Sequence, residues 1–281
     1  MVEPVETPLA VSNPRVKQLR RLSRRSERSE RRLFLADGPK AVEGALAAGC
    51  VEEVLCRPDA VGLVPDLPAD VRRTLVDERA LAALSDSVSP AGVVAVCRFV
   101  DVPLERAVTE QSRLVAICAD VRDPGNAGTV VRCADAAGAD SVVLAGSSVD
   151  LYNPKTLRAS VGSAFHLPVA VEPDPFAAVR AAQAAGLAVL AADGAGDVDL
   201  FEADELLARS TAWLFGNEAW GLPDDLAAAA RRAKAKVRAG QVDVYTHWST
   251  PEKAEPWAIR GLLAPEFDEP VFAEYLMSKP I

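Results

Sequence analysis

The sequence predicts an α/β protein built from two domains. Its 281 residues exceed the usual size of one domain, and 49% of them are hydrophobic, which is enough for a sizeable core. The second half of the chain alternates short, continuously apolar runs with helical patterns. Strands of this kind are buried on both faces, so they predict a parallel sheet with helices on each side.

The first domain is predicted over residues 1–105. A helical pattern near the N-terminus is followed by strands and helices in alternation. The expected strands are RLFLADG, VEEVLC and GVVAVCRFV, and the expected helices are PKAVEGALAAG, which Gly49 ends, and ERALAALSD. The more polar stretch DVPLERAVTEQS has no clean period and is the candidate linker.

The second domain is predicted over residues 106–239, and residues 240–281 form a tail of different composition. The expected strands of this domain are RLVAICAD, SVVLAG, PVAVE, LAVLAADG, TAWLFGNE and KAKVR. The expected helices are GTVVRCADAAGA, PKTLRASVGSA, DPFAAVRAAQAAG and PDDLAAAARRA. The stretch DPGNAG is expected as a short bend before the first of these helices, with Arg132 one turn into it. DGAGD at 193–197 indicates a turn.

Two loops of the second domain are candidates for a ligand site. DPGNAG and FGNEAWGLP each follow a predicted strand and combine Gly, which permits close backbone approach, with Asn or Glu. Ligands of parallel sheets bind beyond the carboxyl ends of the strands. Neither loop has the GxGxxG spacing, and the chain contains no P-loop motif, so an ordinary nucleotide-binding enzyme is the weaker alternative.

Charge is unevenly distributed along the chain. The net charge is −9, yet residues 13–32 carry nine basic and two acidic side chains, a local charge of +7 that leaves −16 for the remainder. Val16, Leu19 and Leu22 recur at helical spacing and are expected to bury one stripe of a basic helix. This asymmetry predicts one arm that binds phosphates. The candidate RNA-binding residues are Arg15, Lys17, Arg20, Arg21, Arg24, Arg25 and Arg28.

Several function classes are disfavoured by composition. No run of about 18 apolar residues occurs and the N-terminus has no apolar signal region, so we expect a cytoplasmic protein without a membrane span. The five cysteines are odd in number and never form CxxC, which predicts core residues rather than disulfides or a zinc cluster. With only His166 and His247 present, we expect no metal site.

Together the two loops resemble the first two signature motifs of the SpoU, or TrmH-like, family of RNA ribose 2'-O-methyltransferases. The matching segments are NAGTVVRCADAAGAD, preceded by DPG, and LFGNEAWGLPDDL. Between them, YNPKTLRASVGSAFHLPV is similar to the middle segment of that family, and the resemblance covers roughly residues 10–238. It implies a small L30e-like α/β RNA-binding domain followed by a parallel-sheet SPOUT methyltransferase domain with a trefoil knot. It also implies S-adenosylmethionine as cofactor, rRNA or tRNA as substrate, a homodimer, and catalysis without a metal.

The resemblance further implies roles for individual residues. Asn126 and Arg132 would face the target ribose, and Glu218 would anchor their polar network. Because arginine stays charged, Arg132 is expected to stabilise the developing alkoxide, or to act through an RNA phosphate, rather than remove the proton itself. The residues expected to border the adenosine of the cofactor are Ala191, Ala192, Leu214, Phe215, Gly216 and Asn217. Ala219 stands where the family more often has Gly.

The C-terminal tail departs from this family. A third motif, with Ser-Leu-Asn opening a last helix, is expected after KAKVR, but no Asn follows Asn217. Residues 240–281 hold six of the fifteen aromatic residues, including Trp248 and Trp257. Either this tail is a replaced or frame-altered C-terminus, or it is a divergence with its own role. The alternative hypothesis is therefore a non-catalytic RNA-binding protein with a degenerate SpoU fold.

Overall fold

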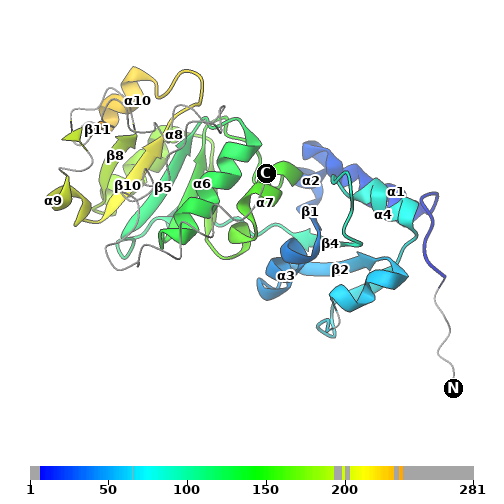
Figure 1. Ribbon diagram of the computed structural model, residues 1–281. Coiled ribbons are helices and arrows are strands. Elements are labelled where there is room, and N and C mark those ends of the chain that lie inside the picture. The colour runs from blue at the N-terminus through cyan, green and yellow to red at the C-terminus, as the bar shows by residue number, and fades with distance from the viewer. Residues whose placement is uncertain (1–6, 65, 193–197, 200–202, 231–233, 237–281) are drawn as a thin grey trace.

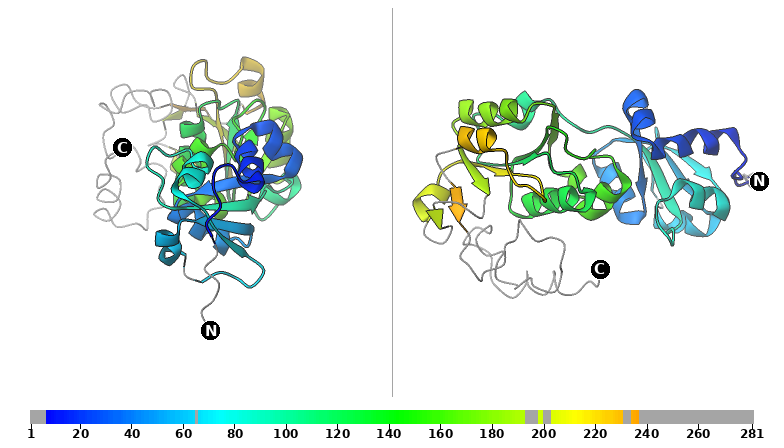
Figure 2. Two further views of the ribbon diagram at one scale, coloured as in Figure 1. Left: turned by 90° about the vertical axis from the view of Figure 1, so that its right-hand side faces the viewer. Right: turned by 90° about the horizontal axis from the view of Figure 1, so that it is seen from above.

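A computed structural model describes residues 7–64, 66–192, 198–199, 203–230 and 234–236. Figures 1 and 2 show two α/β domains side by side, each built on its own sheet. The predicted α/β class is confirmed. The predictions for residues 240–281, for the turn at 193–197 and for a trefoil knot that the tail completes fall on residues outside the described ranges.

The first domain contains a four-stranded sheet in the order β1-β4-β2-β3. The two β4 pairings are antiparallel and β2 pairs with β3 in parallel. The strands are β1 (Leu33–Asp37), β2 (Val51–Cys56), β3 (Arg72–Leu75) and β4 (Val93–Arg98). The helices are α1 (Pro14–Arg20), α2 (Arg25–Arg31), α3 (Pro39–Ala47) and α4 (Glu78–Leu84), with 3₁₀ turns η1 (Arg21–Ser23) and η2 (Pro58–Leu63). The predicted elements are all present, and β3 is a short strand that the pattern did not predict.

The N-terminal basic stretch is not one helix. Val16, Leu19 and Leu22 are buried against α4 and β4, as predicted. The helix ends there because Arg24 is extended, with φ −91° and ψ 133°, so α1 with η1 and α2 form two short segments. The basic side chains therefore project from two helices of different direction.

The second domain contains a parallel sheet in the order β7-β6-β5-β10-β8-β11-β9. All of its strand pairings are parallel, which confirms the prediction from the continuously apolar runs. The strands are β5 (Leu114–Ala119), β6 (Ser141–Ala145), β7 (Val169–Glu172), β8 (Ala188–Ala192), β9 (Val198–Asp199), β10 (Thr211–Phe215) and β11 (Lys234–Lys236). The helices are α5 (Leu104–Ala107), α6 (Pro124–Ala136), α7 (Pro154–Ser160), α8 (Pro175–Ala184), α9 (Asp204–Leu207) and α10 (Asp224–Ala229), with the 3₁₀ turn η3 (Ser163–Phe165).

Helices cover both faces of this sheet. Buried side chains of α6 and α7 pack on one face, and those of α5, α8 and α10 pack on the other. The predicted linker belongs to this packing, because Val102 N donates to Val169 O at 2.9 Å and α5 contacts β7. The stretch packs against the sheet because burying its apolar side chains removes apolar surface from water. These side chains are Val102, Leu104, Ala107 and Val108.

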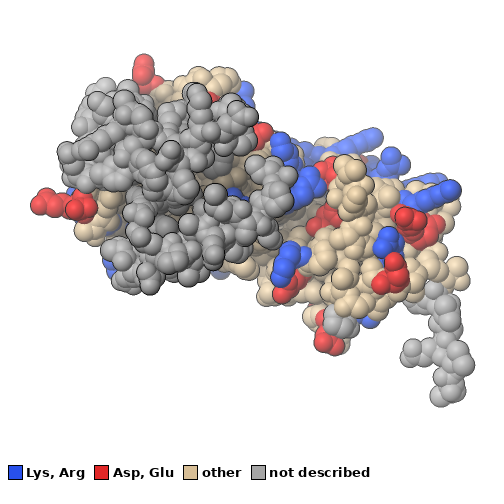
Figure 3. Space-filling view, viewed as in Figure 1, with Lys and Arg blue, Asp and Glu red and all other residues tan. Residues whose placement is uncertain are grey.

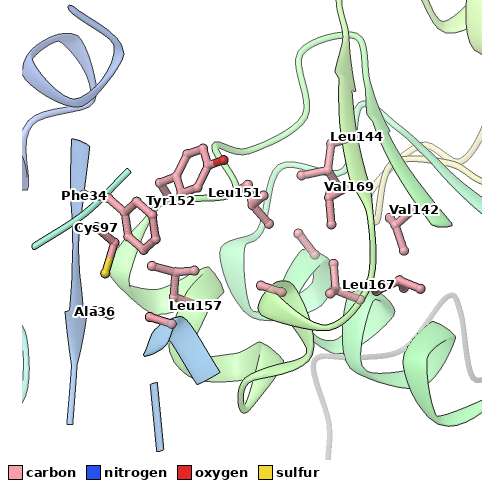
Figure 4. Packing of buried hydrophobic residues seen from close by; sticks show 14 of the residues in the cluster. Phe34, Ala36, Cys97, Val142, Leu144, Leu151, Tyr152, Leu157, Leu167 and Val169 are labelled. Carbon is pink, nitrogen blue, oxygen red and sulfur yellow. The ribbon is translucent and has the colours of Figure 1, made fainter. Parts of the chain in front are cut away.

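The two domains share one hydrophobic core. Phe34 of β1 and Tyr152, which precedes α7, lie with ring centroids 4.6 Å apart, and Phe99 stacks on Tyr152 at 3.7 Å. Figure 4 shows this cluster passing from Phe34 and Cys97 through Leu151 to Leu167 and Val169 of the second domain. Continuous packing of this kind fixes how the domains are oriented.

Candidate active site

The two glycine-containing loops meet at the carboxyl edge of the second sheet. Strands β5 and β10 are neighbours, with Phe215 opposite Cys118 in register, and each loop leaves its strand at the same edge. The chain runs outward through β6 and β7 on one side of β5, and returns to β8 and β10 on the other. This reversal is the place where parallel sheets bind ligands.

Hydrogen bonds join the two loops directly. The carboxylate of Glu218 accepts the backbone N–H of Asp123 at 3.2 Å and, more weakly, that of Arg122 at 3.4 Å. The side-chain amide of Asn217 donates to Asp120 O at 2.8 Å. The structure therefore brings together the two motifs that sequence predicts to form one site, although almost a hundred residues separate them.

Asn217 is a positioning residue within this edge. It is buried, and its Oδ1 also accepts Ala219 N at 2.9 Å. Its partner Asp120 has φ 57°, a left-handed conformation that a side chain disfavours and that surrounding bonds must hold. Asp120 Oδ1 in turn accepts Ser147 N at 2.7 Å. The loop after β5 is thus fixed from both neighbouring strands.

Gly216 is required by close backbone packing. A Cβ at this position would lie 2.4 Å from the carbonyl carbon of Gly221, which leaves no room for any side chain. Asn217 N donates to Gly221 O at 2.9 Å and Gly221 N donates back to Asn217 O at 2.8 Å. The loop between them closes on itself as a tight turn, with Gly221 at φ 69°.

The first motif begins a helix earlier than predicted. Pro124 is the first residue of α6, and Asp123 caps it by accepting Asn126 N at 2.9 Å. DPGNAG is therefore the start of the helix rather than a bend before it, and Arg132 lies about two turns from the helix start instead of one. The signal was present in the sequence, since Asp followed by Pro is typical of a helix start.

Asn126 and Arg132 are both half-buried on α6. Six residues of helix place them about 120° apart around the axis, and no hydrogen bond joins their side chains in the described part of the chain. Within the same ranges, Arg132 has no ion-pair partner. No described carboxylate therefore neutralises its guanidinium, and a direct orienting bond from Asn126 to Arg132 is not present.

The residues predicted to border the cofactor lie at the ends of adjacent strands. Leu214 is opposite Ala191 and Phe215 is opposite Ala192 in the β10–β8 pairing. The Ala191 and Leu214 side chains are fully buried against α8, so only their backbones can reach a ligand. With Gly216 this edge offers backbone polar groups between apolar side chains, which fits the chemistry of an adenosine.

Cys118 lies near the end of β5, at this edge of the sheet. Burial raises the pKa of the Cys118 thiol to about 12, so this cysteine stays protonated and is neither a nucleophile nor a base. Among the residues that the structure describes, no group of three or more His, Cys, Asp or Glu side chains is arranged to hold a metal ion.

No described helix is both long and apolar enough to cross a membrane.

The predicted RNA-binding residues divide into two groups. Lys17, Arg20, Arg24 and Arg25 are exposed and form no ion pair with a described residue. Figure 3 shows blue side chains gathered along the upper surface of the first domain, where Figure 1 places α1 and α2. Arg15 and Arg21 are engaged instead, Arg15 with the buried Glu53 at 2.5 Å and Arg21 with Glu27.

For Arg28 the prediction is wrong. Arg28 is only 3% exposed. Its guanidinium donates hydrogen bonds to the Asp150 carboxylate at 2.5 and 3.0 Å and to the carbonyl oxygens of Leu22 and Ser23. A side chain with these partners cannot contact RNA. The helical pattern could not reveal this, because Asp150 lies 122 residues away in the sequence.

Two residues of this edge carry no predictive sequence pattern of their own. Arg122 and Trp220 lie in the two motif loops, and the Arg122 guanidinium carbon is 5.2 Å from the Trp220 ring centroid. Neither had a signal stronger than that of an ordinary surface residue. The sequence signal that points to this pair is a large apolar Trp inside a predicted loop.

Comparisons with known proteins agree with this arrangement. Residues 113–242 match the SpoU rRNA Methylase family and residues 13–95 match the MRM3-like substrate binding domain. The chain is 38% identical over 161 residues to the 23S rRNA (guanosine(2553)-2'-O)-methyltransferase RlmP of Bacillus subtilis. This match covers 57% of the chain and 62% of the relative, so the chain spans less than two thirds of that protein.

A longer match and a solved structure cover more of the molecule. The uncharacterized tRNA/rRNA methyltransferase slr1673 of Synechocystis is 31% identical over 219 residues, which are 76% of this chain and 78% of the relative. The AdoMet-bound rRNA methyltransferase from Sinorhizobium meliloti superposes with a TM-score of 0.75 at 30% identity and covers 96% of this chain and 98% of its own. Since both motifs, both domains and the full-length neighbours agree, the chain belongs to the SpoU rRNA methylase family.

Proposed function

We propose that this chain transfers a methyl group from S-adenosylmethionine to a ribose 2'-hydroxyl of ribosomal RNA. The observation that carries the proposal is the direct bonding of Glu218 and Asn217 to the segment Asp120–Asp123, which joins the two motifs at one edge of the sheet. The names of the relatives support rRNA, rather than tRNA alone, as the substrate class.

Arg132 is the residue that we assign to the reacting hydroxyl. A ribose hydroxyl is a weak nucleophile at neutral pH because it keeps its proton, and negative charge develops on its oxygen only as that proton leaves during attack on the methyl carbon. A half-buried guanidinium that forms no ion pair with a described residue stabilises such a charge in a less polar environment than water. Arginine keeps its own proton, so the hydroxyl proton leaves to another acceptor, such as an RNA phosphate oxygen.

The strand ends at Ala192, Phe215 and Gly216 are assigned to the cofactor. When bound, S-adenosylmethionine supplies an electrophilic methyl group on a sulfonium, so no metal is needed. The backbone of these residues and the apolar side chains beside it would hold the adenosine end, and Asn217 keeps the loop in place through Asp120. Glu218 acts on the site by holding the backbone of the first motif rather than by contacting Arg132.

The first domain supplies RNA affinity in this proposal. Lys17, Arg20, Arg24 and Arg25 lie on a surface with no described acidic partner, which suits contact with phosphates. A homodimer in the cytoplasm is the accompanying hypothesis for assembly and location. The alternative, an RNA-binding protein without activity, keeps the same basic surface and differs only at the carboxyl edge of the second sheet.

Methyl transfer tests the proposal directly. The protein is incubated with isotope-labelled S-adenosylmethionine and rRNA from cells lacking the corresponding gene, and the RNA is digested to nucleosides for mass spectrometry. We expect one labelled 2'-O-methyl nucleoside. Calorimetric titration with the cofactor accompanies this assay. RNA binding without cofactor binding and without methylation would establish the non-catalytic alternative.

A further inference from the structure

Trp220 is an exposed aromatic residue in the second motif loop. It is 62% exposed and lies two residues after Glu218, next to Gly221. A tryptophan that remains this exposed leaves a large flat apolar surface in water. Because Trp220 lies beside the joined motifs rather than on a remote surface, its exposed ring is placed to contact a ligand of this site.

Hydrogen bonds hold the backbone of the turn that carries Trp220. The reciprocal bonds between Asn217 and Gly221, at 2.9 and 2.8 Å, close the turn that carries it. Ala219 N is held by Asn217 Oδ1, and Gly216 packs against the backbone of Gly221. The ring is therefore presented on a rigid turn, which lowers the entropy cost of binding a partner.

Arg122 is positioned against the same ring. Its guanidinium lies 5.2 Å from the ring centroid, within the range of a cation–π contact. Its backbone N–H reaches Glu218, so the same carboxylate that joins the motifs also places Arg122. One guanidinium covers one face of an indole, and the exposed fraction of Trp220 shows that much of the ring stays open.

We propose that Trp220 and Arg122 form a stacking platform for an unpaired nucleobase of the substrate RNA, next to the nucleotide that is methylated. This inference rests on the proposed function for its choice of RNA. A nucleotide offers both groups that the pair recognises: a flat base for the open indole face and a phosphate for the guanidinium.

The platform restricts the class of RNA that the site accepts. Stacking requires a base whose face is free, so the neighbour of the target must lie in a loop, a bulge or a single strand. Since every base has a flat face, the platform selects unpaired structure and not a particular base. Sequence recognition is left to other contacts.

Fluorescence titration without cofactor tests the platform separately from methylation. The probes are poly(U) and poly(A) oligoribonucleotides, a duplex RNA, and inorganic polyphosphate as a ligand with charge but no bases. We expect the single strands to quench tryptophan fluorescence and Trp220→Phe to remove most of that quenching. Trp220→Ala is expected to weaken single-strand binding about tenfold or more, with polyphosphate binding unchanged. Arg122→Ala weakens it less, and because Glu218 bonds only the backbone of Arg122, the loop contact remains.

Arg106→Ala is the matched control, because it removes an exposed arginine on α5, which packs at the β7 side of the sheet. It should bind single strands as the parent does.

The platform is overturned if Trp220→Ala binds poly(A) as tightly as the parent does, even in a protein that methylates RNA. A change of oligomeric state in Trp220→Ala, measured by sedimentation velocity, also overturns it and assigns this surface to a second copy of the chain. If the variants show the expected changes in binding but the RNA is not methylated, the stacking platform is supported and only the proposed activity is contradicted.

Discussion

Arg28 of the first domain and Asp150 of the second form a buried ion pair, with the guanidinium Nη2 2.5 Å from the carboxylate Oδ2. Arg28 also donates to two carbonyls at the end of the preceding 3₁₀ turn, so one side chain ties that turn, α2 and the second domain together. Removing one member of a buried pair leaves the other charge without compensation. This ion pair therefore joins the two domains through a polar contact, in addition to the shared aromatic core.

The first prediction concerns this pair. Asp150→Ala should lower the free energy of unfolding by about 3 kcal/mol or more, because the Arg28 charge stays buried without its carboxylate. Chemical denaturation measures the change. Asp86→Ala is the control, because it breaks another ion pair between the domains, with Arg158 at 3.0 Å, in which both side chains are exposed. It should have little effect. Equal losses in the two variants would show that burial is not decisive here.

The second prediction separates the exposed basic residues from Arg28. Replacing Arg20, Arg24 and Arg25 with Ala should reduce the slope of log affinity against log salt by about 2 to 3, roughly one per lost phosphate contact. Filter binding over a range of salt concentrations measures it. Arg28→Ala should lower stability and leave the slope of the folded protein unchanged. An unchanged slope in the triple variant would contradict the assignment of α1 and α2 to RNA.

The third prediction concerns Arg132. If its guanidinium stabilises the alkoxide, Arg132→Ala should lower the rate of methyl transfer on the order of a hundredfold or more, with cofactor affinity nearly unchanged. Arg132→Lys should restore little, since an ammonium does not reproduce the planar fork. Single-turnover kinetics and calorimetry measure the two quantities. Parallel losses of rate, cofactor affinity and thermal stability would instead indicate that Arg132 only braces α6.

The fourth prediction concerns the contact of α6 with α7. A Cβ on Gly128 would lie 2.5 Å from Thr156 O and 2.6 Å from the Ala159 side chain, and the first of these is backbone that cannot turn away. Gly128→Ala should therefore destabilise the protein by about 1 to 3 kcal/mol, despite the better helix propensity of alanine. Gly62→Ala, with no atom within 4 Å of the new Cβ, is the control. Thermal unfolding that ranks the two variants alike would refute the packing argument.

The fifth prediction concerns Tyr152 at the domain interface. Its hydroxyl accepts the N–H groups of Val100 and Asp101 at 2.7 Å and donates to the Asp101 carboxylate at 2.6 Å. Burial, followed by the bond to Asp101, raises the pKa of Tyr152 above its usual range. The folded protein therefore holds this proton more tightly than the unfolded chain does. The resulting stability is present below about pH 10, the unfolded value, and is lost as the pH rises further.

Comparison with Tyr152→Phe isolates this group from the lysines that titrate in the same window. The difference in free energy of unfolding between parent and variant should be constant at neutral pH and should shrink above about pH 10. Urea denaturation at several alkaline pH values measures that difference. A difference that does not depend on pH would show that the Tyr152 proton is not held by the fold.

Much of the fold followed from periodicity. The continuous apolar runs predicted β5, β6, β7, β8 and β10, and their parallel pairing, because strands buried on both faces have no polar alternation. The helical pattern that begins at Gly128 predicts the start of α6 four residues late, because the glycines of PGNAG indicate a bend. Asp123 as a cap and Pro124 at the first position outweigh the low helix propensity of those glycines.

Local pattern and motif spacing are sufficient to predict the α/β class, the parallel sheet, the family and the two loops of the candidate site. Contacts between residues far apart in the chain become visible only once the chain is folded. Arg28 is predicted as an RNA ligand, but in the structure it is buried and paired with Asp150. Glu218 is predicted to anchor the polar network of Asn126 and Arg132, and in the structure its carboxylate accepts the backbone N–H of Asp123. Trp220 and Arg122 became a pair in the same way. The physical reason is that ion pairs and stacking contacts act over a few ångströms in space, and sequence spacing carries no record of that distance.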